Sequence, residues 1–118
     1  MSEIPTRHFL MERLNDLIRN EKCIIFCKTK CGFCDLADEF FTSKALHCKK
    51  VLLDDNPWAS APLQEKTQLT TVPNIFINGV PVGGYQQLSE YWAKCQRINK
   101  AEEQADVVCM FLLKRQGV

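Results

Sequence analysis

The chain has 118 residues, 46% of them hydrophobic, and a formal net charge of +1. This length predicts a single domain over residues 1–118 that buries a modest core without help from metals or disulfides. The small net charge excludes the strong positive field of a nucleic-acid or membrane-surface binder, and no apolar run is long enough to span a bilayer. We therefore expect neither nucleic acid nor a membrane as a partner.

Seven cysteines are present, and the N-terminal residues show no apolar signal region. We expect a cytoplasmic protein in a reducing compartment, with mitochondrial import left open. In such a compartment a cysteine pair indicates redox or metal chemistry and not a disulfide staple. Four cysteines are interpreted as small core or surface residues, with secondary redox sites as the alternative: Cys23, Cys48, Cys95 and Cys109.

The first predicted element is a helix that starts near residue 5 or 6. Its apolar residues recur at positions i, i+4, i+7 and i+8: Leu10, Leu14, Leu17 and Ile18. This stripe is expected to cover one face of a sheet. A turn at residues 20–22 then leads into residues 23–27, an apolar run without alternation, which indicates a strand buried on both faces.

Residues 27–34, Cys-Lys-Thr-Lys-Cys-Gly-Phe-Cys, follow this strand and precede a helical pattern. Cys31 therefore stands at a helix N-cap, where unpaired amides, the helix dipole, Lys28 and Lys30 favour the thiolate that attacks disulfides. Cys34 lies one turn further on, with its sulfur directed to the helix interior, near enough to capture a mixed disulfide. We predict Cys31 as the nucleophile and Cys34 as the resolving thiol.

The helix after Cys34 is expected to bury apolar residues at helical spacing: Leu36, Ala37, Phe40 and Phe41. A second strand is predicted at residues 49–53, ended by a turn that contains Asn56-Pro57, and this gives the start of a βαβ unit. Residues 58–69 are predicted to form a weak helix.

Residues 70–84 combine a strand pattern, an Asn78-Gly79 hairpin turn and a second short strand. Pro73 stands at the start of the first strand, where a missing amide is tolerated. A cis bond is a candidate there, because it would leave backbone groups of Val72 free for a partner.

Gly83 and Gly84 follow the hairpin and precede a helix predicted from Leu88 onward. Amides at the start of this helix could face an anion. A final helix is predicted after Asn99, stopped by Gly117.

Zinc binding is an alternative interpretation of the two central cysteines, because a CxxC pair is half of a zinc ribbon. A second CxxC is absent, and only His47 and Cys48 could complete four ligands. We therefore expect no metal at this pair.

Three stretches, in this order and spacing, resemble the motifs of the glutaredoxin branch of the thioredoxin fold. The first is residues 28–34, which end in the sequence CGFC. The second is residues 71–79, in which Thr-Val-Pro precedes Asn-Ile-Phe-Ile-Asn-Gly, and the third is Gly83-Gly84. The resemblance covers nearly the whole chain. It implies an α/β, thioredoxin-like fold, in which a four-stranded mixed sheet is flanked by helices.

The resemblance also implies a dithiol enzyme that reduces glutathione mixed disulfides and protein disulfides through Cys31, with glutathione as the reductant. Its implied partners are glutathione and disulfide-bearing or glutathionylated proteins. In the family pattern Lys28 meets the glycine carboxylate of glutathione, Val72 pairs with its cysteine, and Gly84 with the following amides holds its γ-glutamyl end. The implied glutathione-site residues are Lys28, Phe33, Thr71, Val72, Pro73, Gly83, Gly84, Tyr85 and Gln86.

Two departures bear on glutathione binding. Tyr85-Gln86 stand where the family usually has a small residue and an aspartate, and Thr70 stands where an arginine often precedes Thr-Val-Pro. Both departures remove charged partners. They raise the hypothesis of weakened glutathione affinity or of a different thiol partner.

Two other functions stay open. Gly32-Phe33 after Cys31 resembles the CGFS motif of monothiol glutaredoxins, in which Cys31 and glutathione would hold a [2Fe-2S] cluster between two subunits. Cys34 in place of the serine favours catalysis by a monomer instead. The remaining alternative is a thioredoxin-like protein disulfide reductase that is recharged by a flavoenzyme.

Overall fold

A computed structural model describes residues 6–99 of the chain. The elements in chain order are α1 (Arg7–Arg19), β1 (Cys23–Cys27), α2 (Gly32–Ser43), β2 (Lys49–Leu52), the 3₁₀ turn η1 (Pro57–Ala59), α3 (Ser60–Thr67), β3 (Asn74–Ile77), β4 (Val80–Gly83) and α4 (Tyr85–Asn99). The final helix predicted after Asn99 lies outside the described residues, and the domain extent of 1–118 stays a prediction. No helix within residues 6–99 has the length and apolar character needed to cross a membrane.

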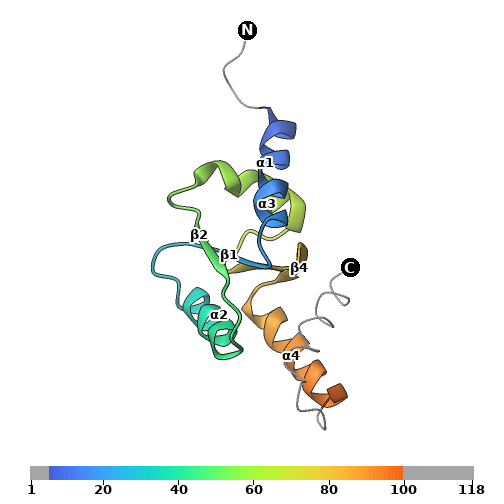
Figure 1. Ribbon diagram of the computed structural model, residues 1–118. Coiled ribbons are helices and arrows are strands. Elements are labelled where there is room, and N and C mark those ends of the chain that lie inside the picture. The colour runs from blue at the N-terminus through green and yellow to red at the C-terminus, as the bar shows by residue number, and fades with distance from the viewer. Residues whose placement is uncertain (1–5, 100–118) are drawn as a thin grey trace.

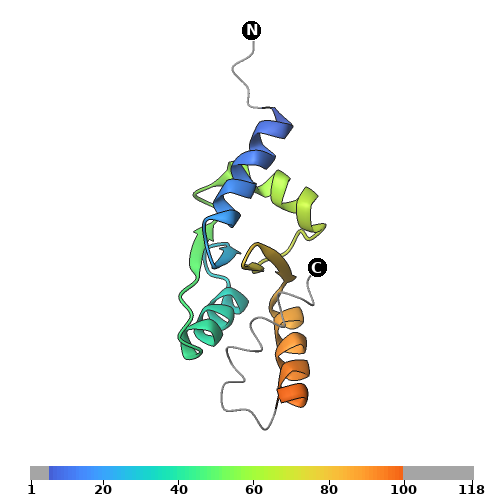
Figure 2. The same cartoon turned by 45° about the vertical axis from the view of Figure 1, so that its right-hand side comes forward.

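The four strands form one mixed sheet in the order β2-β1-β3-β4. β1 is parallel to β2 and antiparallel to β3, and β3 pairs with β4 in an antiparallel hairpin. Helices α1 and α3 lie above the sheet in Figure 1, and α2 and α4 lie below it, an arrangement that Figure 2 shows from a second side. The predicted four-stranded mixed sheet with flanking helices is confirmed.

β1 is the central strand of this arrangement, and all five of its residues are buried. Ile24 and Phe26 pack in the cluster under α1 and α3, whereas Ile25 and Cys27 pack in the cluster under α2 and α4. A strand between two helical layers needs apolar side chains on both of its faces. This need explains the unbroken apolar run that predicted the strand.

α1 begins after Thr6, whose side-chain oxygen accepts a hydrogen bond from the amide of Phe9. Such a contact satisfies one of the unpaired amides of a helix start. Leu14 and Ile18 of the predicted apolar stripe are buried against the sheet. The prediction that this helix covers one face is therefore confirmed.

Three sequence-based boundaries and faces differ from the structure. The weak helix predicted at residues 58–69 is split into η1 and α3, and Gln68 ends α3 in the left-handed conformation with φ of 63°. α4 begins at Tyr85 and not at Leu88. Leu36 was expected in the core, but 42% of it is exposed because it points away from the sheet side of α2.

The cysteine assignments need one correction. Cys23 and Cys48 were interpreted as separate core or surface residues, but they form a disulfide. They stand one position before Ile24 and Lys49, which pair in the parallel ladder, so the two backbones run side by side there. Cysteine spacing alone does not reveal such a pairing, because it depends on the register between the two strands.

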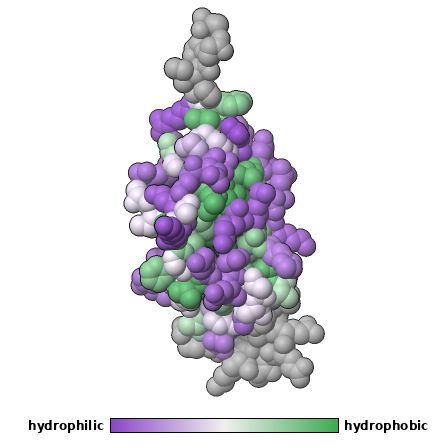
Figure 3. Space-filling model, turned by 90° about the vertical axis from the view of Figure 1, so that its left-hand side faces the viewer, coloured by the Kyte–Doolittle hydropathy of each residue, from purple (hydrophilic) through white to green (hydrophobic). Residues whose placement is uncertain are grey.

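β2 is an edge strand with exposed Lys49 and Lys50 at its start. Figure 3 shows the face at this edge, where hydrophobic residues gather among hydrophilic ones. A shallow hollow of about 460 Å³ lies here, between α1, β2 and η1. Lysines on a sheet edge oppose pairing with another strand. These two residues therefore protect this edge of the sheet.

Truncation of Leu14 to alanine should destabilise the protein by about 3 kcal/mol, because it opens a cavity at a fully buried position. The matched control is Phe9→Ala on the same helix, which removes a side chain that is 55% exposed and should change stability by less than about 0.5 kcal/mol. Urea unfolding of both variants measures the difference. Equal losses would mean that α1 does not pack as described.

Candidate active site

Cys31 stands in the loop between β1 and α2 and is the N-cap of α2, as predicted. Its Sγ accepts a hydrogen bond from the amide of Cys34 at 3.2 Å and donates one to the carbonyl oxygen of Val72 at 3.9 Å. Lys30, with φ of 59°, provides the sharp turn before it. Cys31 is partly exposed, so its sulfur lies where the end of a helix meets solvent.

Cys34 lies one turn later and is almost fully buried, with 2% exposure. Burial raises the pKa of the Cys34 thiol well above its ordinary value, and hydrogen bonds with Cys31 and Cys27 raise it further. Cys34 therefore stays protonated at neutral pH. Of the two sulfurs in the CxxC pair, Cys31 is the accessible one and Cys34 the protected one.

Cys27, at the end of β1, is a third sulfur at this centre. It is buried, as the strand prediction required, and its burial raises the pKa of its thiol. Its side chain shares a hydrogen bond with Cys34. Sequence reasoning missed this contact, because it assigned Cys27 to the strand and did not follow its side chain under α2.

A groove of about 300 Å³ lies beside Cys31. It is lined by Phe33, Thr71, Val72, Pro73, Gly84, Tyr85, Gln86 and Gln87. All the sequence-predicted glutathione-site residues except Lys28 and Gly83 meet here. The Val72 carbonyl that contacts Cys31 belongs to the groove wall, so the sulfur lies at the edge of the groove.

The two walls of the groove come from segments that are far apart in the sequence. Phe33, which is 61% exposed, lies at the start of α2, and its ring centroid is 5.9 Å from that of Tyr85 at the start of α4. The floor is the segment before β3, where the Val72–Pro73 peptide bond is cis, as the sequence suggested. Exposed Phe33 and partly buried Tyr85 together offer apolar area to a ligand without further folding.

This segment is tied to the core at its two ends. The side-chain amide of Asn74, a buried residue at the start of β3, donates to Oγ1 of Thr67 at 2.9 Å, and Thr67 donates to the carbonyl oxygen of Leu63 at 2.9 Å. Thr67 is the last residue of α3. The loop between Thr67 and Asn74 therefore leaves and enters rigid elements, which fixes the Val72 backbone beside Cys31.

Gln87 is a groove residue that sequence reasoning missed. Its Oε1 accepts a hydrogen bond from the amide of Gly84 at 2.9 Å, three residues earlier, which is the spacing of a capping box. This contact explains why α4 starts at Tyr85. It also occupies the Gly84 amide that was predicted to hold a ligand, and leaves the amides of Tyr85, Gln86 and Gln87 as those without a partner inside the helix.

Gly83 does not line the groove, but its conformation shapes the turn into α4. It has φ of 109°, a region that L side chains rarely adopt. A Cβ added there would lie 3.0 Å from the Cβ and Cγ of Gln87. Gly83 therefore allows the close approach of Gln87 to the start of the helix.

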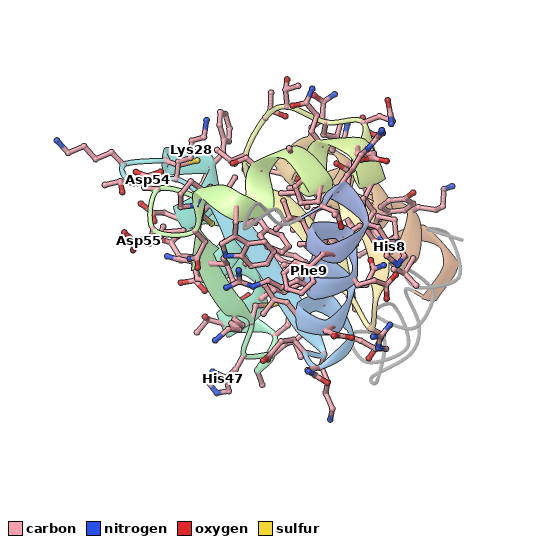
Figure 4. The ribbon with its side chains drawn as sticks, turned by 90° about the horizontal axis from the view of Figure 1, so that it is seen from above. His8, Phe9, Lys28, His47, Asp54 and Asp55 are labelled. Carbon is pink, nitrogen blue, oxygen red and sulfur yellow. A yellow bond between two sulfur atoms is a disulfide. The ribbon has the colours of Figure 1, made fainter. Side chains whose placement is uncertain are left out.

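Lys28 is exposed in the loop after β1 and does not line the groove. Figure 4 shows it beside Asp54, which follows β2. Asp54 accepts a hydrogen bond from the amide of Thr29 at 3.3 Å. Hydrogen bonds from the Thr29 side chain and backbone lower the pKa of Asp54, and the charge of Lys28 contributes.

Asp54 therefore fastens the loop that carries Lys28 and Cys31 to the end of the neighbouring strand. The sequence interpretation assigned it only to a turn. A signal was present, because β1 and β2 were expected to belong to a βαβ unit, and the carboxyl ends of two parallel strands meet at one edge of the sheet.

Comparisons with known proteins agree with this geometry. Residues 23–82 match the glutaredoxin family model. The chain is 30% identical to glutaredoxin-C1 of Arabidopsis thaliana, over 69% of this chain and 67% of that protein. It is 34% identical to mitochondrial glutaredoxin-2 of Bos taurus, over 63% of this chain and 49% of that protein. The match thus spans about half the length of this mitochondrial relative.

Solved structures give the same fold. Wheat glutaredoxin is 26% identical with a TM-score of 0.68, over 86% of this chain and 91% of that chain. A buckwheat glutaredoxin–glutathione complex is 24% identical with a TM-score of 0.72, over 87% of this chain and 92% of that chain, which shows likeness of fold. The thioredoxin-like architecture is thereby confirmed. From the family match over residues 23–82 and these relatives, the chain belongs to the glutaredoxin family.

Proposed function

We propose that this chain is a dithiol glutaredoxin, a glutathione-dependent oxidoreductase that reduces glutathione mixed disulfides and protein disulfides, built as one domain over residues 1–118. The observation that carries the proposal is the position of the accessible Cys31 sulfur at the edge of the groove, against the Val72 carbonyl. A nucleophilic sulfur beside a ligand-sized groove can meet a disulfide whose one half is held in that groove.

In the first step the Cys31 thiolate attacks the glutathione sulfur of a mixed disulfide. A bond forms between Cys31 and glutathione, and the substrate leaves as a thiolate, which takes up a proton. Cys31 suits this role because it is partly exposed and stands at a helix start, where its sulfur accepts the Cys34 amide hydrogen bond. Cys34 does not suit it, because its thiol is buried and its pKa is raised.

Two routes then regenerate Cys31. A second glutathione thiolate attacks the bound glutathione sulfur, which forms glutathione disulfide and releases the Cys31 thiolate. With a protein disulfide as the substrate, Cys31 attacks one of its sulfurs, and Cys34 then loses its proton, attacks the Cys31 sulfur and releases the second protein thiol. Two glutathiones reduce the resulting Cys31–Cys34 disulfide and leave as glutathione disulfide, which frees Cys31. The hydrogen bond between the two cysteines supports this second route, because the sulfurs are already neighbours.

The groove supports glutathione as the molecule that is held. Backbone groups of Val72, the Phe33–Tyr85 aromatic pair and the first amides of α4 line it, which together offer partners to a short peptide with charged ends. The buckwheat glutaredoxin of the same fold is a complex with glutathione. By the family resemblance, Lys28 would meet the glycine carboxylate.

The same arrangement suggests the other partners. Glutathionylated or disulfide-bearing proteins are the proposed substrates, and the enzyme is proposed to act as a monomer without nucleic acid or membrane. A cytoplasmic location remains our proposal. Because some relatives are mitochondrial, a mitochondrial location is the alternative.

The [2Fe-2S] carrier is the second candidate function. Within residues 6–99 no group of three or more His, Cys, Asp and Glu side chains is placed to hold a metal. A cluster at Cys31 would therefore need ligands from a second chain and from glutathione. The thioredoxin-like alternative would leave the groove beside Cys31 without a small-molecule occupant.

The assay that tests the proposal measures reduction of a glutathione mixed disulfide with glutathione, glutathione reductase and its nicotinamide reductant supplied. Cys31→Ser should lower the rate about a thousandfold or more, because the attacking sulfur is lost. Cys34→Ser is the matched control. It should keep activity on the mixed disulfide and lose reduction of a protein disulfide.

Each contrary outcome points to one alternative. An inactive unmodified protein that is brown and dimeric after anaerobic purification with glutathione would favour the cluster carrier. An unmodified protein that is regenerated only by a flavoenzyme would favour the thioredoxin-like reductase. Loss of mixed-disulfide activity in Cys34→Ser would contradict the assignment of Cys31 as the sole nucleophile in this reaction.

Gln86→Asp tests the missing carboxylate at the start of α4. The new charge should attract the γ-glutamyl ammonium and lower KM for glutathione by up to about fivefold, with kcat unchanged, as expected for an exposed ion pair. Gln64→Asp on α3 adds the same charge away from the groove and should leave KM unchanged. Equal KM values in the unmodified protein and Gln86→Asp would reject a γ-glutamyl site there.

A further inference from the structure

A second pair of sulfurs lies away from the groove. Cys23 begins β1, and Cys48 comes immediately before β2; they form a disulfide, with Cα atoms 4.5 Å apart. Figure 4 shows His47, next to Cys48, far from Lys28 and Asp54, which mark the active-site end of the same two strands. The disulfide and the CxxC pair therefore occupy opposite ends of β1.

The position of this bond decides what it constrains. It joins residues 25 apart in the sequence, and the enclosed segment contains β1, the active-site loop and the whole of α2. At the other end of the two strands, the Leu53 amide donates a hydrogen bond to the Cys27 carbonyl oxygen at 2.8 Å, and the Thr29 amide donates one to the Asp54 carboxylate. The disulfide links the amino ends of the same two strands. It therefore limits the conformations that the segment between Cys23 and Cys48 can adopt when the protein unfolds.

The two sulfurs differ in access. Cys23 is 1% exposed in the cluster under α2 and α4. Cys48 is partly exposed and lies between His47 and Lys49, which are both exposed. Thiol–disulfide exchange needs a direct approach of the attacking sulfur to the sulfur it attacks. A small thiol or disulfide in solution can therefore reach this pair only through Cys48.

We propose that Cys23 and Cys48 are a second redox couple, formed and broken by glutathione disulfide and glutathione through Cys48, which stabilises the β1–α2–β2 unit outside the catalytic cycle. To form the bond, the Cys48 thiolate attacks glutathione disulfide and releases one glutathione. The Cys23 thiolate then attacks Cys48 and releases the second. Two electrons pass from the protein thiols to glutathione disulfide, and two protons leave with them. Reduction by two glutathiones is the reverse.

This couple gives the protein its greatest stability under the conditions that generate its proposed substrates. Glutathione disulfide and glutathionylated proteins accumulate together when the glutathione pool is oxidised. The site does not touch the groove or Cys31, so its state should change stability and leave the chemistry at Cys31 intact. The inference stands on the disulfide itself and does not require the proposed catalytic activity.

The experiment uses the full chain with Cys31→Ser and Cys34→Ser, so that the CxxC pair contributes no redox change. The protein is equilibrated in buffers from excess glutathione to excess glutathione disulfide, quenched with acid, alkylated and mapped by peptide mass. The Cys23 and Cys48 peptides should go from alkylated to disulfide-linked across the series. The melting temperature should rise by about 10 °C over the same range.

Cys48→Ser in the same background should melt at one temperature in all buffers, whereas the neighbouring control His47→Ser should keep the full shift. In an otherwise unmodified chain, Cys48→Ser should retain the wild-type rate in reducing assay buffer. Free Cys23 and Cys48 in the most oxidising buffer would overturn the proposal. So would a bond that excess glutathione leaves intact, or a melting shift that persists in Cys48→Ser.

Discussion

The structure depends on the burial of β1 between two helical layers. Its five side chains alternate between the cluster under α1 and α3 and the cluster under α2 and α4, and it pairs with strands on both sides. Among residues 6–99, β1 and β3 are the two strands that pair with a neighbour along both edges. A shift of β1 by one residue would bring the charged side chain of Lys22 or Lys28 into the buried span, so the ends of the strand are fixed in space.

Both sulfur centres of the described chain take their positions from those ends. At the carboxyl end, Cys27 meets Cys34, and the following loop turns at Lys30 to present Cys31 at the start of α2. At the amino end, Cys23 lies beside Cys48. The active site adds only two further fixed parts: the Val72 carbonyl before β3, and the start of α4, where Gly83 allows the turn.

The sequence predicted the elements well where one local rule dominates. The unbroken apolar run of β1, the Asn78-Gly79 turn and the N-cap position of Cys31 each follow from short-range chemistry. It predicted less well where distant residues decide. The exposure of Leu36 and the Cys23–Cys48 bond depend on the packing of α2 and on the register of β1 with β2, neither of which a single stretch of sequence contains.

The hydrogen bond between Gln87 and the Gly84 amide has a consequence for affinity. A ligand whose carboxylate takes that amide must first displace the side-chain oxygen already there, so the groove contains its own internal competitor. The net gain is then the difference between two hydrogen bonds, and not the full value of one. Selectivity at this end of the groove therefore rests on charge, since an anion outcompetes a neutral amide oxygen for the positive end of α4.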